Sequence, residues 1–251
     1  MALLAEMNKH GVSRVVLQTD HSPDLTLHPG LLSVYRTVEK TWGAIAAVCP
    51  RILPLIYAFD PTEDSSWDYV GERLKTGNYA GVGEIEFIHS KFGIRKPVHS
   101  KTMDKIYEAL AASEGIFHLQ ADTRGAPEVE AEIDALIRSY PRIKFIWFAG
   151  PRCFDIDGVT NLICTLFPNE YMERLSSGPE GAMSRMVLGT DHSPSGFHSA
   201  SAGHLPYDSF GEGIAAARVR LMRLSPALRD AVAHGHFDTL VPPTGSVPGA
   251  H

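Results

Sequence analysis

The sequence has little of three features that would assign it to a special class: cysteine, clustered positive charge and long hydrophobic runs. Its three cysteines are far apart and form no CxxC pair, so we expect reduced thiols in a cytoplasmic protein. The longest apolar stretch, residues 43–59, is interrupted by two prolines and an arginine, so we expect no membrane span. The first ten residues lack the basic start and cleavage site of a signal peptide, and we expect none.

Charge of either sign is spread thinly along the chain. There are 23 Lys and Arg against 29 Asp and Glu, a net charge of −6, and no basic stripe that would bind phosphates, so we expect no nucleic-acid partner. The 251 residues and 44% hydrophobic content suit one globular α/β domain. We predict a single domain over residues 1–241 and a disordered tail over 242–251.

Short apolar runs alternate with helical patterns from one end of the chain to the other. Nearly continuous apolar runs are typical of parallel strands that are covered on both faces. We predict seven such strands, at residues 14–18, 52–59, 79–87, 115–121, 144–150, 161–167 and 185–191. Helical spacing follows in the sets Met103, Ile106, Tyr107, Leu110 and Val129, Ile133, Leu136, Ile137.

This alternation predicts a parallel sheet, either doubly wound or a TIM-barrel-type (β/α) barrel. The first predicted element is a helix that ends near Gly11, whereas an eight-stranded barrel normally begins with a strand. A barrel reading therefore implies seven recognisable strands and a missing first strand.

Polar and aromatic side chains gather at the carboxyl ends of the predicted strands, where α/β folds place their active sites. Carboxylates and imidazoles recur among them, and these are the groups that bind zinc or manganese. The candidates are Gln18, Asp20, His21, Asp60, Glu84, Glu86, His118, Asp122, Trp147, Phe148, Asp191 and His192.

Two of these strands leave alternatives open. Glu84 and Glu86 share one face of their strand and are either site carboxylates or solvated and helix-capping ones; Gly81 and Gly83 favour a site because they allow other groups to approach the backbone. His118 lies within an apolar strand, so it is either a hydrogen-bonded core residue or a ligand.

The pentapeptide TDHSP occurs twice, at residues 19–23 and 190–194, each time after an apolar strand. If the barrel closes on seven strands, Asp20, His21, Asp191 and His192 converge at one mouth. Asp191, which ends its own predicted strand, is either a metal ligand or general base, or else the N-cap of the next element. His198 lies in the following loop, either as a substrate-binding residue or as a surface histidine.

The segments AGVGEIEF, FHLQAD and MVLGTDHSP, in this order, resemble the amidohydrolase superfamily, closest to its amidohydrolase-2 and TatD-like branches. That family has a (β/α)8 barrel with one or two divalent metals at its mouth. Carried over by position, the resemblance implies Glu84, His118 and Asp191 as ligands, with Asp191 also the general base.

The chain departs from the family pattern at two positions. No His-x-His strand precedes the first helix, and the sixth-strand histidine is replaced within Ile146, Trp147 and Phe148. Three interpretations follow: a barrel incomplete at its start, a site rebuilt with Asp20, His21 or His192, or a metal-free relative. In the last, Trp147 and Phe148 line an aromatic pocket, although strand-end aromatics usually belong to the core.

The leading functional prediction is metal-assisted hydrolysis of a small amide, lactone or ester by an activated water. The alternatives are a metal-free or inactive small-molecule binding protein, or a decarboxylase or hydratase of the same superfamily. An open barrel seam exposes strand edges, so we expect a homodimer or higher oligomer. The assigned residues are Asp191 and His192 for catalysis; Glu84, His118, Asp191 and His21 for zinc or manganese, or no metal; and Asp20, Glu86, Trp147, Phe148 and His198 for substrate.

Overall fold

The computed structural model describes residues 2–18, 29–89, 93–121, 126–148, 156–166, 186–188, 218–219, 221–222, 224–235 and 238. The chain divides into two compact units, one formed by Val15–Cys164 with Pro242–His251 and one by Met1–Arg14 with Thr165–Val241. A single domain over residues 1–241 stays a prediction, and the predicted disordered tail lies outside the described residues.

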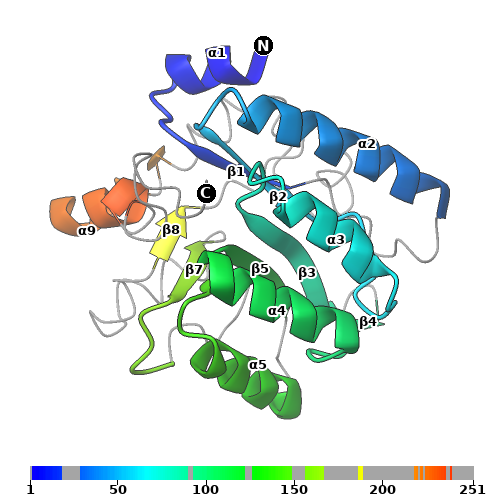
Figure 1. Ribbon diagram of the computed structural model, residues 1–251. Coiled ribbons are helices and arrows are strands. Elements are labelled where there is room, and N and C mark those ends of the chain that lie inside the picture. Colours follow the sequence, from blue (N-terminus) through cyan, green and yellow to red (C-terminus); the bar gives the residue numbers. More distant parts are fainter. Residues whose placement is uncertain are drawn as a thin grey trace. The chain divides into compact units, whose positions relative to one another are not determined.

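The larger unit is built on a curled sheet whose strands follow the order β1-β2-β3-β5-β6-β7 (Figure 1). The pairs from β1 to β6 along this order are parallel, and only the short β4 is antiparallel, beside the end of β3. The bounds are β1 Val15–Leu17, β2 Ile52–Ile56, β3 Gly81–His89, β4 Ile94–Arg95, β5 Ile116–Ala121, β6 Lys144–Phe148 and β7 Leu162–Leu166.

All seven predicted strands are present, the seventh as β8 (Met186–Leu188) in the smaller unit. The predicted fold class is confirmed: the chain is an α/β protein of TIM-barrel type whose barrel is incomplete. The two-residue β4 is the one described strand that the apolar pattern does not predict.

Four helices of the larger unit lie along one face of its sheet: α2 (Pro29–Ala46), α3 (Ser66–Leu74), α4 (Lys101–Ser113) and α5 (Pro127–Ser139) (Figure 1). Local chemistry sets their ends. Ser100 caps α4 by accepting a hydrogen bond from the Met103 amide at 3.1 Å. Pro127 opens α5 at a position where a missing N–H costs nothing.

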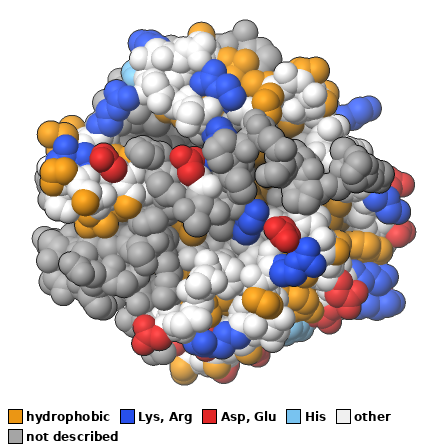
Figure 2. Space-filling model, turned by 60° about the vertical axis from the view of Figure 1, so that its left-hand side comes forward, with side chains coloured by type: hydrophobic (Ala, Val, Ile, Leu, Met, Phe, Trp, Pro, Cys, Tyr) orange, Lys and Arg blue, Asp and Glu red, His pale blue; other side chains and the backbone are white. Residues whose placement is uncertain are grey.

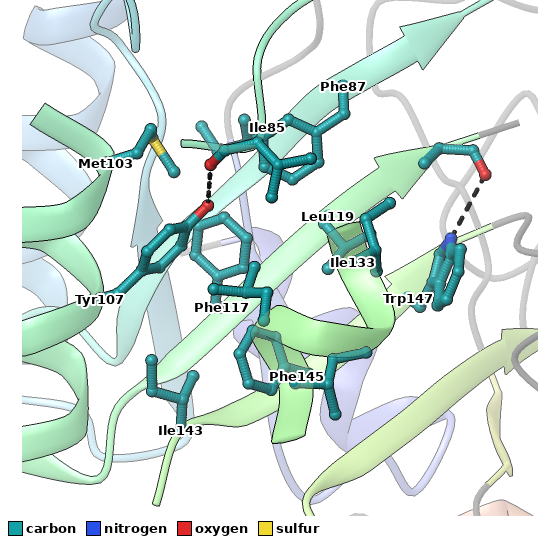
Figure 3. Close-up of a cluster of buried hydrophobic side chains, with 14 of the residues drawn as sticks. Ile85, Phe87, Met103, Tyr107, Phe117, Leu119, Ile133, Ile143, Phe145 and Trp147 are labelled. Atoms are coloured by element: carbon teal, nitrogen blue, oxygen red, sulfur yellow. Dashed lines mark hydrogen bonds between the residues drawn. The ribbon is translucent and has the colours of Figure 1, made fainter. Parts of the chain in front are cut away.

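The core of this unit lies between the helices and the sheet (Figure 3). The predicted apolar faces of α4 and α5 are buried in it, with Met103, Tyr107 and Ile133 fully inaccessible. The Tyr107 ring stands edge-on to that of Phe117 at 5.2 Å between centroids, and its hydroxyl donates to the Val98 carbonyl oxygen at 2.7 Å. The buried hydroxyl therefore keeps a partner.

The smaller unit contains α1 (Ala2–Lys9), β8, α9 (Pro226–Asp230) and the π-helical turn η2 (Ala231–Gly235). Gly11 follows α1 with a φ of +62°, a left-handed conformation that glycine adopts without strain, as the predicted helix stop requires. Arg14 forms an ion pair with Asp238, and Arg218 donates to the His10 carbonyl oxygen.

The cysteine prediction is wrong at one position. Cys164 is disulfide-bonded, whereas Cys49 is a free thiol, so the expectation of reduced thiols fails for Cys164. The sequence pattern offered no warning, because the cysteines have no short spacing that would suggest a pair.

Charged side chains of both signs are interspersed on the face seen in Figure 2. Several pair at the surface, as Arg95 does with Glu128 and Lys101 with Asp64, each at 2.5 Å. Such exposed pairs contribute little to stability. Across the described helices, none combines the length and apolarity that crossing a membrane would need.

Candidate functional site

The pairing of β3, β5 and β6 brings a polar face together on the side of the sheet opposite the helices. Alternation along β5 points Phe117 and Leu119 into the helix-facing core and turns His118 and Gln120 to the other face. The register pairs Glu86 with Gln120, so the β3 carboxylates face the same way. All four polar side chains of this face are buried: Glu84, Glu86, His118 and Gln120 are 2–8% exposed.

A bulge in β3 makes this arrangement possible. Val82 pairs with Phe117 and Ile85 with Leu119, so β3 has one more residue than β5 between these pairs. Gly83 lies in this interval with a φ of +133°, and a Cβ atom there would approach the His118 carbonyl oxygen to 2.3 Å. The expectation that this glycine permits close approach is confirmed, and the closely approaching group is the backbone of β5.

Gln18, at the end of β1, connects two of the predicted ligands. Its Nε2 donates to Glu84 Oε2 at 2.6 Å, and its Oε1 lies 2.7 Å from His118 Nδ1. One amide thus spans from the carboxylate on β3 to the imidazole on β5. The sequence placed Gln18 at a strand end but assigned it no role.

A second amide serves the two carboxylates. With its nitrogen toward the glutamates, Gln120 donates to Glu84 Oε1 at 2.7 Å and to Glu86 Oε1 at 3.2 Å. Both oxygens of Glu84 therefore accept hydrogen bonds from amide groups, one from Gln18 and one from Gln120. In both amides the nitrogen faces carboxylate oxygens, which accept hydrogen bonds, as the chemistry of these groups requires.

Glu86 differs from an ordinary surface glutamate in its acidity. Burial raises its pKa from 4.5 to about 7, and the positive charge of Lys96 opposes part of the rise. Lys96 follows β4 and bonds through its backbone N–H to the Phe87 carbonyl oxygen at 2.8 Å. Lys96, which the short β4 brings to β3, is therefore close enough to Glu86 for its positive charge to act on that carboxylate.

The two strand-end aromatics of β6 lie in different surroundings. Trp147 is fully buried in the helix-facing core, where its Nε1 donates to the Ala121 carbonyl oxygen at 3.3 Å (Figure 3). Phe148 turns to the polar face and stands edge-on to the His118 ring, with 6.3 Å between centroids. Of the two residues predicted for an aromatic pocket, Phe148 is therefore the one beside the site.

Six of the predicted candidates lie outside the described residues: Asp20, His21, Asp122, Asp191, His192 and His198. Within the described residues, no group of three or more His, Cys, Asp or Glu is placed to hold a metal ion. Glu84 and His118, buried and joined through Gln18, fit the donor chemistry of zinc or manganese as two ligands. A third ligand would have to come from outside the described residues.

The strand end after β2 carries polar groups with structural roles. Asp60 accepts from the Thr62 amide at 2.8 Å and from its hydroxyl at 2.7 Å, which closes a local turn. Glu39 reaches the same strand end from α2 and accepts from the backbone amides of Tyr57 and Ala58. No motif in the sequence singled out Glu39.

The sequence matches no protein-family model and no curated protein. Solved structures nevertheless share its fold. An amidohydrolase II aligns at a TM-score of 0.61 and 13% identity, over 95% of this chain and 87% of that one. A probable 2-pyrone-4,6-dicarboxylic acid hydrolase from Acinetobacter baumannii with citric acid bound aligns at 0.61 and 10%, over 95% and 87%. A 2,6-dihydroxybenzoate decarboxylase from Rhizobium aligns at 0.61 and 12%, over 95% and 86%.

The resemblance drawn from the sequence motifs is thus borne out at the level of fold. The chain has the architecture of amidohydrolase-type barrels, and proteins with this architecture include both a hydrolase and a decarboxylase.

Proposed function

We propose that the protein is an amidohydrolase-type enzyme that hydrolyses a small amide, lactone or ester with the help of a divalent metal. The observation that carries the proposal is the buried connection from Glu84 through Gln18 to His118. It holds a carboxylate and an imidazole at the strand ends where the family resemblance implies ligands. Asp191 is the third proposed ligand, with His21 as its alternative or addition.

Zinc or manganese bound there would polarise the substrate carbonyl and lower the pKa of water. The chain's own residues would supply proton transfer and orientation. With a pKa of about 7, Glu86 can accept or release a proton near neutral pH. Phe148 would exclude water beside His118, and Asp191 with His192 would accept and pass on the proton of the attacking water.

The substrate class follows from the compounds named for proteins of the same fold. Both 2-pyrone-4,6-dicarboxylic acid and 2,6-dihydroxybenzoate are small ring carboxylates. We therefore propose a small ring lactone or ester with a carboxylate group. Lys96, whose positive charge opposes the rise in the pKa of Glu86, would supply a cation for such a carboxylate.

The test is the metal content of purified chain, measured by elemental analysis. We expect about one equivalent of zinc or manganese, lost in Glu84→Ala and in Asp191→Ala. Glu128→Gln, an exposed position on α5, is the control and should retain the metal. Metal retained in both Glu84→Ala and Asp191→Ala would overturn this ligand set.

A metal-free small-molecule binding protein is the second candidate. The position on β6 that pairs with His118 is Ile146, so this strand supplies no imidazole beside it. A chain that contains no metal, and is equally stable with Glu84→Gln, would favour this candidate. Release of carbon dioxide or addition of water, tested on small ring carboxylates, would instead favour a decarboxylase or hydratase.

A further inference from the structure

The amide of Gln18 lies between a group that accepts hydrogen bonds and a group that can either donate or accept. Glu84 Oε2 is 2.6 Å from its nitrogen, and His118 Nδ1 is 2.7 Å from its oxygen. Gln18 directly follows β1, whereas Glu84 lies in β3 and His118 in β5, so the contact links the end of β1 to two other strands of the same unit.

The amide has one donor end and one acceptor end, and this polarity determines the state of the histidine. An ionised carboxylate only accepts hydrogen bonds, so the amide nitrogen must face Glu84. The amide oxygen then faces His118 Nδ1, which must carry a proton in order to donate. In the neutral ring the lone pair is therefore on Nε2. The Gln120 amide, which donates to the other Glu84 oxygen, favours the same carboxylate form.

We infer that Gln18 is a positioning residue that holds neutral His118 as its Nδ1–H tautomer. Nε2 is then the nitrogen that binds a metal or accepts a proton. The use made of Nε2 rests on the proposed function, whereas the tautomer is a property of the metal-free chain. Metal-binding histidines are commonly held through the outer ring nitrogen, and loss of that support weakens metal affinity by about 10- to 100-fold.

The tautomer can be read directly by nuclear magnetic resonance. The full chain, labelled with nitrogen-15 at histidine and freed of metal, is studied at about pH 8, where an ordinary imidazole is neutral. Signals of His118 are identified by their loss in His118→Gln. Long-range proton–nitrogen correlations should place the ring proton on Nδ1 in the wild-type chain.

Two substitutions of Gln18 and one control substitution test the hydrogen bonds of the Gln18 amide. Gln18→Met keeps the side-chain length and removes both hydrogen bonds, so the ring proton should move wholly or partly to Nε2. Gln18→Glu keeps an acceptor for Nδ1–H and should preserve the tautomer. Gln120→Met is the matched control, because Gln120 donates to Glu84 and makes no hydrogen bond with His118; it should also preserve the tautomer.

A wild-type ring proton on Nε2 overturns the inference, as does a folded Gln18→Met chain that keeps Nδ1–H. If Gln18→Met does not fold by circular dichroism, the wild-type spectrum decides. Zinc titration against a competing chelator gives a second readout: Gln18→Met should bind about 10- to 100-fold more weakly, and unchanged affinity overturns the positioning role. A chain with the expected tautomer that binds no zinc supports the tautomer assignment and overturns the metal part of the proposed function.

Discussion

At the scale of single residues, Glu86 reduces the stability of the folded chain near neutral pH. Because its folded-state pKa is raised to about 7, the folded state holds a proton that the unfolded state has already lost above pH 4.5. The free energy of unfolding therefore falls as pH rises between these two values. The penalty is complete above about pH 7 and amounts to about 3 kcal/mol at most.

Glu86→Gln should remove this penalty without changing the shape of the side chain. In metal-free buffer, we expect the variant to be more stable than wild type by up to about 3 kcal/mol at about pH 8, and by much less at about pH 5. Urea unfolding at the two pH values measures the difference. Glu128→Gln is the control, because this carboxylate is exposed and its pKa is lowered; an equal gain at both pH values for Glu86→Gln would contradict the assignment.

Residue identities at the site were partly predictable. That Glu84, Glu86 and His118 lie on one face could be predicted, because strand ends in parallel sheets gather at one edge and the strands follow from the local apolar pattern. The role of Gln18 was not predictable, since its partner His118 is 100 residues away and the contact depends on strand register. Trp147 and Phe148 looked equivalent in the sequence, and only the alternation of β6 in the folded sheet separates them.

At the scale of elements, Glu39 ties α2 to the end of β2. Its Oε1 accepts from the backbone amides of Tyr57 and Ala58, and its Oε2 accepts from the Tyr69 hydroxyl at 2.6 Å. Arg36, also on α2, donates to the Ala58 carbonyl oxygen at 3.1 Å. Burial raises the pKa of Glu39, while these hydrogen bonds and the charge of Arg73 oppose the rise.

Glu39→Ala should destabilise the larger unit by about 2–4 kcal/mol, because it leaves two buried amides and a hydroxyl without their acceptor. Tyr69→Phe removes one hydrogen bond to the same carboxylate and should cost about 1 kcal/mol. Thermal and urea unfolding of both variants give the comparison. Equal losses in the two variants would mean that the backbone amides find other partners, and that Glu39 does not anchor the strand end.

Elements with continuous apolar character were predicted well, since burial on both faces requires apolar residues throughout. β5 is an example, with every residue buried. β4 was missed because two residues, Ile94 and Arg95, carry no period. The contact between Glu39 and β2 joins a helix to a strand end through one carboxylate, and no spacing rule in the sequence announces such a contact.

At the scale of the whole molecule, the barrel is incomplete, and β1 pairs among the described strands with β2 alone. Unpaired strand edges favour association with another chain. We expect a homodimer or higher oligomer, seen in multi-angle light scattering as at least twice the mass of the chain. The β1 amides should also exchange with solvent more slowly as protein concentration rises. A monomer whose β1 exchange is independent of concentration would contradict this prediction.

The bulge at Gly83 has a consequence for how β3 is encoded. Before it, even-numbered Val82 packs in the core; after it, odd-numbered Ile85 and Phe87 do so, while even-numbered Glu84 and Glu86 face the polar side. One inserted residue thus changes the phase of the strand halfway along. If β3 alternated regularly through Gly83 instead of bulging, the period of two from Val82 would direct both carboxylates into the core and Ile85 and Phe87 toward His118. The placement of both carboxylates on the polar face therefore depends on the bulge, in which Gly83 takes up the extra residue without a side chain of its own.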